Sequence, residues 1–258
     1  MSDGYREHAP SLVLARHVDK LWVRDGVSTH AQRVLPDGCV DIIVQLGDEP
    51  RAEVVGTMTT ALLVPPGARR MVAVRMRAGA AASVLGQPVD ALTDRRVALD
   101  VWWRDAAALY DALAAATDSH AQLAILAARL TRALVDAPPI DREVEHAAMR
   151  LAGEAPPTIA ALARELGRSR QHLARRFTAA VGVGPKVFAR VARLARLVRS
   201  LRAAPDWAEL AAAHGYADQA HLVHDFGALV GCTPGQYAAG SIPPIRAAAA
   251  DVVSSARP

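Results

Sequence analysis

The sequence predicts an α+β protein, in which a β-rich N-terminal domain precedes an all-α C-terminal domain. Three observations lead to this prediction. Short apolar runs separated by turn residues occupy residues 18–78, and apolar residues at helical spacing dominate after about residue 79. The C-terminal half also repeats one residue pattern at an interval of about 49 residues. The repeat predicts two similar helix pairs joined by a long helix.

The N-terminal region contains five candidate strands, at residues 18–23, 39–46, 53–55, 62–64 and 71–76. Turn sequences separate them, among them Pro-Asp-Gly at 36–38 and Pro-Pro-Gly at 65–67. Strand 71–76 is typical of a strand with one mostly buried face. We therefore expect the strands to form the core of the first domain.

Four candidate helices follow, at residues 80–85, 103–115, 121–135 and 140–151. Proline pairs at 138–139 and 156–157 bracket the last of these, because proline blocks helix continuation. We place the domain boundary near residue 137. The expected organisation is a β-rich domain with C-terminal helices over 1–136, a helical domain over 137–240 and a poorly ordered tail over 241–258.

The repeat gives each copy the pattern of a helix-turn-helix. Gly167 and Gly215 each end a short helix, since glycine tolerates the left-handed conformation of a helix C-terminus. Ser169 and Asp218 are favourable N-caps for the next helix, and the spacing is identical in both copies from these residues onward. Apolar residues four positions apart then point inward: Leu173 and Phe177 in the first copy, Leu222 and Phe226 in the second.

Between these inward positions, the second helix of each copy presents polar and small side chains. They are Arg170, Gln171, Ala174 and Arg175 in the first copy, and Gln219, Ala220, Val223 and His224 in the second. Arginine, glutamine and histidine near a helix N-terminus can bind base edges and phosphates in a DNA major groove. A plain helical bundle is the alternative interpretation of two such helix pairs.

The positive charge is concentrated in one segment of the chain. Residues 158–202 contain eleven arginines and lysines and one acid, so they net +10, whereas the whole chain nets +4. Such an asymmetry favours a polyanionic partner, and a solvated helical face is the alternative. Within this segment an apolar stripe predicts one helix over 185–201, and this helix can hold two units about 34 Å apart along DNA.

The C-terminal region, residues 157–239, resembles the AraC/XylS regulators. The most specific stretches are residues 215–226, which begin Gly-Tyr-Ala-Asp-Gln-Ala-His, and the Gly-x-Thr-Pro-x-x-Tyr ending of residues 231–237. The resemblance implies a sequence-specific DNA-binding transcription regulator, not an enzyme, whose two recognition helices bind adjacent major-groove segments. The implied DNA-binding residues are Ser169, Arg170, Gln171, Ala174, Arg175, Asp218, Gln219, Ala220, His221 and His224.

Two features modify this resemblance. Family members often have basic residues around the second aromatic, where this chain has His224, Asp225 and Gly227. We therefore expect the first unit to supply most of the affinity. The N-terminal half resembles the β-rich domain of one subgroup at residues 35–43, 54–56 and 92–95, which implies a role in effector sensing or dimerisation.

The expected partner is double-stranded DNA. Further expected partners are a small-molecule effector in the N-terminal domain, a second copy of the chain, and RNA polymerase if the protein activates transcription. No apolar run approaches the roughly 20 residues of a membrane span, and the N-terminal residues lack a secretory signal. We therefore expect a cytoplasmic protein with reduced Cys39 and Cys232, although these two cysteines could pair.

The alternative function is a small-molecule-binding protein or an enzyme whose basic helices do not bind DNA. His8, His17 and His30 lack metal-site spacing, so we expect no metal, no cofactor and no catalytic residue. Cys39 is either a strand residue or a reactive thiol. Three tryptophans either pack in the core or line a pocket: Trp22, Trp102 and Trp103. A further hypothesis is pH-sensitive DNA binding through four histidines: His172, His214, His221 and His224.

Overall fold

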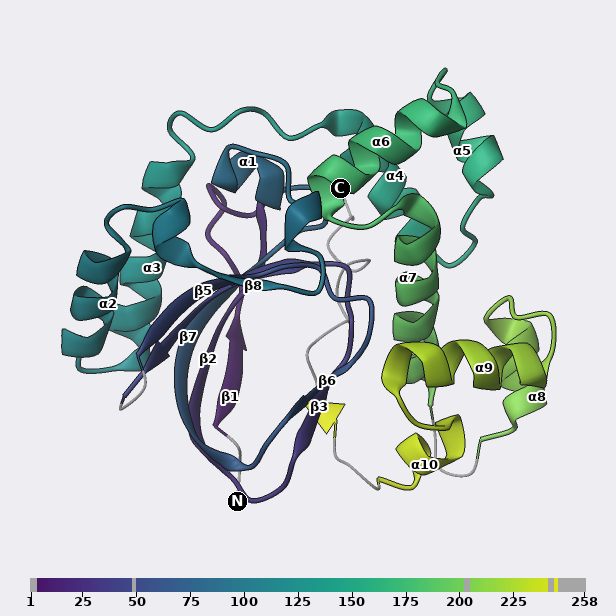
Figure 1. The fold of residues 1–258 in the computed structure, drawn as a ribbon, viewed down its shortest axis with the longest axis horizontal. Coiled ribbons are helices and arrows are strands. Elements are labelled where there is room, and N and C mark those ends of the chain that lie inside the picture. The colour runs from purple at the N-terminus through teal and green to yellow at the C-terminus, as the bar shows by residue number, and fades with distance from the viewer. Residues whose placement is uncertain (1–3, 48–49, 202–204, 241–243, 246–258) are drawn as a thin grey trace.

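The structure is a computed structural model that describes residues 4–47, 50–201, 205–240 and 244–245. It confirms the predicted fold class, with a β-rich region followed by a helical domain. Figure 1 shows the main sheet between helices of the N-terminal region on one side and the C-terminal helices on the other. No helix among the described residues is long and apolar enough to cross a membrane.

The main sheet has six antiparallel strands. In spatial order they are β1 (Tyr5–His8), β2 (Val18–Ser28), β7 (Gly67–Met76), β4 (Val40–Leu46), β5 (Arg51–Val55) and β8 (Arg96–Ala98). A second, small sheet has the order β6 (Leu62–Val64), β3 (Gln32–Val34) and β9 (Pro244–Ile245). All five predicted strands are confirmed, whereas β1, β3, β8 and β9 were not expected. Strand β8 lies after residue 79, in the region where the sequence predicts mainly helices.

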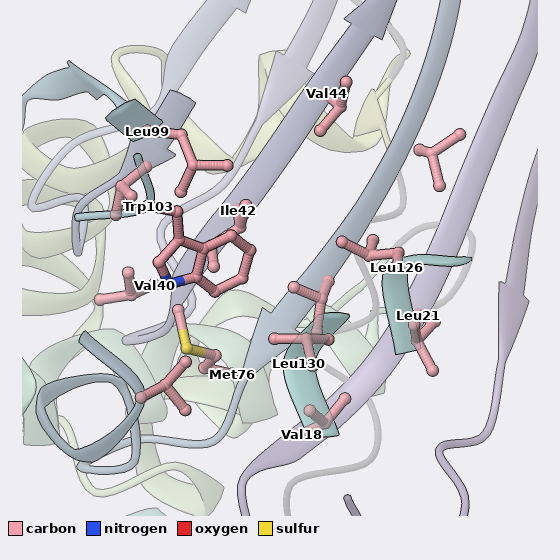
Figure 2. Packing of buried hydrophobic residues seen from close by; sticks show 14 of the residues in the cluster. Val18, Leu21, Val40, Ile42, Val44, Met76, Leu99, Trp103, Leu126 and Leu130 are labelled. Atoms are coloured by element: carbon pink, nitrogen blue, oxygen red, sulfur yellow. The ribbon is translucent and has the colours of Figure 1, made fainter. Parts of the chain in front are cut away.

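One face of the main sheet is covered by helices. The helices that follow β7 in the N-terminal region are α1 (Ala81–Leu85), the 3-10 turns Asp90–Leu92 and Leu99–Val101, α2 (Ala106–Ala115) and α3 (Ser119–Ala133). Alternate residues of β4, such as Ile42 and Val44, are completely buried beneath α2 and α3. Figure 2 shows Leu126 and Leu130 of α3 in this cluster, together with Trp103. Trp103 is therefore a core residue, which supports core packing over a pocket lining for this tryptophan.

The sheet also carries a buried group of charges. Arg75 Nε of β7 lies 3.0 Å from the Asp37 carboxylate and 3.5 Å from that of Asp41. Burial raises the pKa of Asp41 to about 6, although the Arg75 charge acts in the opposite direction. Burial also raises the pKa of the neighbouring Cys39 thiol, which disfavours the thiolate and supports the structural interpretation of that cysteine.

The C-terminal helices form two adjacent cores. The helices are α4 (Arg142–Ala152), α5 (Ile159–Glu165), α6 (Arg170–Val181), α7 (Pro185–Ser200), α8 (Trp207–Ala213), α9 (Gln219–Val230) and α10 (Pro234–Ala238). Phe188 near the start of α7 packs edge-on against Phe177 in the first core, and Leu194 further along α7 is buried in the second core with Phe226. The long helix α7 therefore belongs to both units (Figure 1).

The N-terminal domain and the helical domain share buried surface. Ala78 and Ala82 pack against the first helical core, and Leu35 is part of the second. The tail expected to be poorly ordered, 241–258, lies outside the described residues except for Pro244–Ile245, which pairs in parallel with β3. The two domains are thus contiguous along both helical units.

Candidate nucleic-acid interface

The two helix-turn-helix units have the same local geometry. Gly167 and Gly215 adopt left-handed backbone angles, with φ of 65° and 71°, as a tight turn after a helix requires. The Ser169 hydroxyl accepts the backbone N–H of His172, and the Asp218 carboxylate accepts that of His221. The predicted glycines and both predicted N-caps are therefore confirmed.

The inward residues determine which face of each second helix is exposed. Leu173 and Phe177 of α6 are buried, and so are Leu222 and Phe226 of α9. Nine of the ten expected DNA-binding residues are exposed, and Ala174 is half-buried. The fold therefore gathers them on two matching surfaces at the N-terminal halves of α6 and α9. A helix N-terminus also carries partial positive charge and free N–H groups, which favour phosphate.

The first surface has exposed cations without an internal partner. Arg170 and Arg175 of α6 form no ion pair within the described residues, and Arg164 of α5 and Lys186 of α7 are likewise exposed and unpaired there. Arg175 approaches only the His172 ring, at 3.5 Å. These side chains are available to an external anion.

Other arginines of the basic segment form hydrogen bonds and ion pairs within the protein. Arg168 and Arg176 both hydrogen-bond to Glu143 at the start of α4, and Arg176 also pairs with Asp141. The hydrogen bond from Arg168, aided by Arg176, lowers the pKa of Glu143 to about 2. Arg196 is buried and donates to the Ala152 carbonyl. The net charge of the segment therefore overstates the number of cations available to DNA.

The second surface is more polar than charged. His221 Nδ1 accepts the backbone N–H of Ala217 at 3.2 Å, so the neutral ring carries its proton on Nε2. Tyr216 packs edge-on against this ring and fixes its plane. The exposed His221 thus presents a hydrogen-bond donor. Asp225 is buried and pairs with Arg190 of α7 at 2.6 Å, so it points away from this surface.

Sequence analysis missed the acids that hold these arginines. Asp141, Glu143 and Asp225 lie 33 to 35 residues from their partners Arg176 and Arg190, and only the tertiary fold brings them together. Among the described residues no group of three or more His, Cys, Asp or Glu side chains could hold a metal ion. Cys39 and Cys232 are both free thiols.

Two family profiles match the chain. Residues 6–98 match a domain of unknown function (DUF6597), and residues 162–240 match a helix-turn-helix domain (HTH_18) of the AraC type. The C-terminal domain is an AraC-type helix-turn-helix domain. The match covers both units described above and confirms the resemblance seen in the sequence. A domain of this type supports a DNA-binding transcription regulator and not an enzyme.

Solved structures with a distant likeness to this chain include those of ToxT from Vibrio cholerae. One ToxT structure is 10% identical, covers 92% of this chain and 98% of ToxT, and has a TM-score of 0.39. Another, in a P21 crystal form, is 9% identical, covers 91% and 96%, and has a TM-score of 0.38. A comparison with curated proteins found no match.

Proposed function

We propose that this regulator binds specific DNA sequences by placing α6 and α9 in two adjacent segments of the major groove. The observation that supports this most strongly is the matched geometry of the two units. Each second helix starts at a capped residue, buries an apolar and an aromatic residue on one face, and exposes polar side chains on the other. Helix α7 belongs to both cores and so links the two surfaces.

The exposed side chains have chemistry suited to separate roles. Arg170 and Arg175 can donate twice to a guanine edge or contact phosphates, and Gln171 and Gln219 can pair with adenine. His221 donates from Nε2 to an acceptor such as guanine O6 or N7. His224 lies one turn further along α9.

The remaining predicted residues complete the surfaces. Ala174 and Ala220 are small, so they permit close approach and contact with thymine methyl groups. The caps Ser169 and Asp218 fix the first turn of each helix, whose free N–H groups can bind phosphate. We also propose that α6 supplies most of the affinity, because its exposed arginines have no counterpart in α9.

Selection of bound fragments from random duplex DNA by the full chain tests this function. We expect one enriched motif with two half-sites whose centres lie about 10–10.5 base pairs apart. Substitutions in α6 then alter one half-site and substitutions in α9 the other. Enriched fragments that share no motif, or a motif that no substitution in α6 or α9 changes, would contradict the proposal.

We further propose that residues 1–136 form a regulatory domain that is in contact with the helical domain. A cleft of about 290 Å³ is the proposed effector site. It is lined by Ala82 of α1, Ile140 of the connection and Arg176 of α6, so it lies between the N-terminal domain and the first DNA-binding unit. A ligand there would touch the recognition helix. Fragment soaks of full-chain crystals, with DNA affinity measured for each bound fragment, test this. Fragments in the cleft that never change the affinity contradict it.

Two protein partners complete the proposed function. A homodimer would place two pairs of recognition helices on one operator, and sedimentation of the full chain with and without DNA tests this. A protein that stays monomeric on its operator contradicts it.

RNA polymerase is the partner if the regulator activates transcription, and transcription in a purified system distinguishes activation from repression.

A further inference from the structure

The C-terminal ends of the two recognition helices have one feature in common. In each helix, the last backbone carbonyl accepts a hydrogen bond from a side chain of the N-terminal domain. The last carbonyls of an α-helix have no partner within the helix. Val181 and Val230 are the final residues of α6 and α9, and each precedes a glycine at the same position of its unit. The Thr57 hydroxyl donates to the Val181 carbonyl, and the Arg33 guanidinium donates to the Val230 carbonyl.

Backbone and side-chain hydrogen bonds strengthen both attachments. At the end of α6, the Val89 N–H donates to the Ala179 carbonyl at 2.8 Å, and the Thr93 hydroxyl donates to the Gly182 carbonyl at 2.5 Å. At the end of α9, the Ala61 N–H donates to the Leu229 carbonyl at 2.7 Å. Thr57 is completely buried and Arg33 is 5% exposed, so water cannot replace these donors.

One short segment of the N-terminal domain touches both helices. Residues 56–61 connect β5 to β6, and they include Thr57, which binds α6, and Ala61, which binds α9. Arg33 lies on β3, which pairs with β6 directly after this segment. The two attachments are therefore parts of one continuous structure.

This segment is held firmly by its surroundings. The Asp94 N–H donates to the Thr57 carbonyl at 3.1 Å, and the Asp94 carboxylate accepts both the N–H and the hydroxyl of Thr59, at 2.7 and 2.6 Å. Asp94 itself has a φ of 56°, which is uncommon for a residue with a side chain. Gly56 lies so close to the Leu92 carbonyl that a Cβ atom would stand 1.8 Å from it. Contacts with Leu92 and Asp94 therefore position the start of this segment.

We propose that residues 56–61 and Arg33 form a brace that fixes the distance and mutual orientation of the two recognition helices. The N-terminal domain then determines which half-site spacing the regulator accepts, and α7 alone does not. This inference rests on the proposed function, in which α6 and α9 each bind one half-site. Thr57 and Arg33 are positioning residues, because they act through the recognition helices and do not touch DNA.

The test compares variants of the full chain on duplexes with different half-site spacing. Thr57→Val keeps the shape of the side chain and removes the donor to α6, whereas Thr57→Ser keeps the hydroxyl. Arg33→Met removes the donor to α9. Thr131→Val is a control for the same substitution at an exposed position, where the Thr131 hydroxyl donates to the Ala127 carbonyl within α3. Thermal unfolding of each variant establishes that it is folded.

We expect the wild-type protein to have a sharp affinity optimum as the spacing varies over about 8–13 base pairs. Thr57→Val and Arg33→Met should bind roughly tenfold more weakly at the optimum and show a flatter spacing profile. Their affinity for a duplex with a single half-site should be unchanged. Thr57→Ser and Thr131→Val should keep the wild-type profile. If Thr57→Val does not fold, Thr93→Val removes a more exposed donor to the same helix end.

Three outcomes would overturn the brace while leaving the proposed function intact. They are an unchanged spacing profile in the variants, an equal loss on the single half-site, and tighter binding at every spacing, which indicates an inhibitory contact. A wild-type protein without any spacing optimum would instead refute two-site binding itself, and the brace with it.

Discussion

Gly38, in the turn before β4, lies directly against the ring of Phe188 in α7. A Cβ atom at position 38 would stand 2.6 Å from Phe188 Cε2, closer than a carbon atom can approach. The glycine also has a φ of 79°, which side chains rarely adopt. The Pro-Asp-Gly turn of the N-terminal domain therefore supports the helix that joins the two DNA-binding units.

Gly38→Ala should be markedly destabilising. The left-handed conformation costs about 1–2 kcal/mol, and the contact with Phe188 adds about 1–3 kcal/mol of overpacking. Gly86→Ala is the matched control, because Gly86 has a φ of 70° but no atom within 4 Å of a Cβ. Urea unfolding of both variants checks this. Equal losses of unfolding free energy would show that the Phe188 contact costs nothing.

Arg175→Ala should weaken specific binding by about 1–3 kcal/mol if Arg175 binds a guanine. The reason is that Arg175 is exposed on α6 and has no acidic partner within the described residues. Arg168→Ala is the comparison, since Arg168 is held by Glu143. Titration on duplexes with each base changed in turn measures the effect. An unchanged preference at every position rules out base contact by Arg175.

His221→Ala should change base preference in the second half-site only. The ring presents an Nε2 donor because Nδ1 accepts the Ala217 N–H. His221→Gln keeps a donor on a flexible side chain and should retain part of the preference. Selection experiments with both variants measure this. A change confined to the first half-site would mean that the assignment of α9 is wrong.

Glu143 should stabilise the fold in a pH-dependent way. Its pKa is lowered from 4.5 to about 2 by Arg168 and Arg176, so the stabilisation is complete above pH 4.5 and is lost as the pH falls from 4.5 toward 2. Wild type should therefore exceed Glu143→Gln in unfolding free energy at pH 7, by a margin that shrinks at pH 3.5. Glu209→Gln, at an exposed carboxylate with no ion pair in the described structure, is the control. A margin independent of pH contradicts this account.

The sequence predicts the elements that have strong periodicity or an internal copy. The strands around Ile42 and Val74 and the two helix pairs all have such signals, and the structure confirms them. Strand β1, with the sequence Tyr-Arg-Glu-His, lies at the edge of the sheet and has no apolar alternation. Strand β8 is only three residues long, too short for a pattern.

The exposed surfaces of the candidate site could be predicted from the sequence, but the ion pairs and hydrogen bonds that hold them in place could not. Caps and inward residues follow from local spacing, so Ser169 and Phe177 could be assigned in advance. The pairing of Arg176 with Asp141 depends on how α4 packs against α6. Thr57 and Arg33 donate hydrogen bonds to backbone carbonyls. Because every residue has a backbone carbonyl, the sequence does not indicate which one accepts such a bond.

The central claim is sequence-specific DNA binding by the paired units, and one titration tests it most directly. The full chain is titrated onto duplex from the upstream region of its own gene and onto a scrambled duplex, each at several salt concentrations. We predict tighter binding to the native sequence, and an affinity that falls steeply with salt, with a slope of about −0.9 per phosphate contact. Absence of binding to either duplex, even at low salt, would contradict the claim.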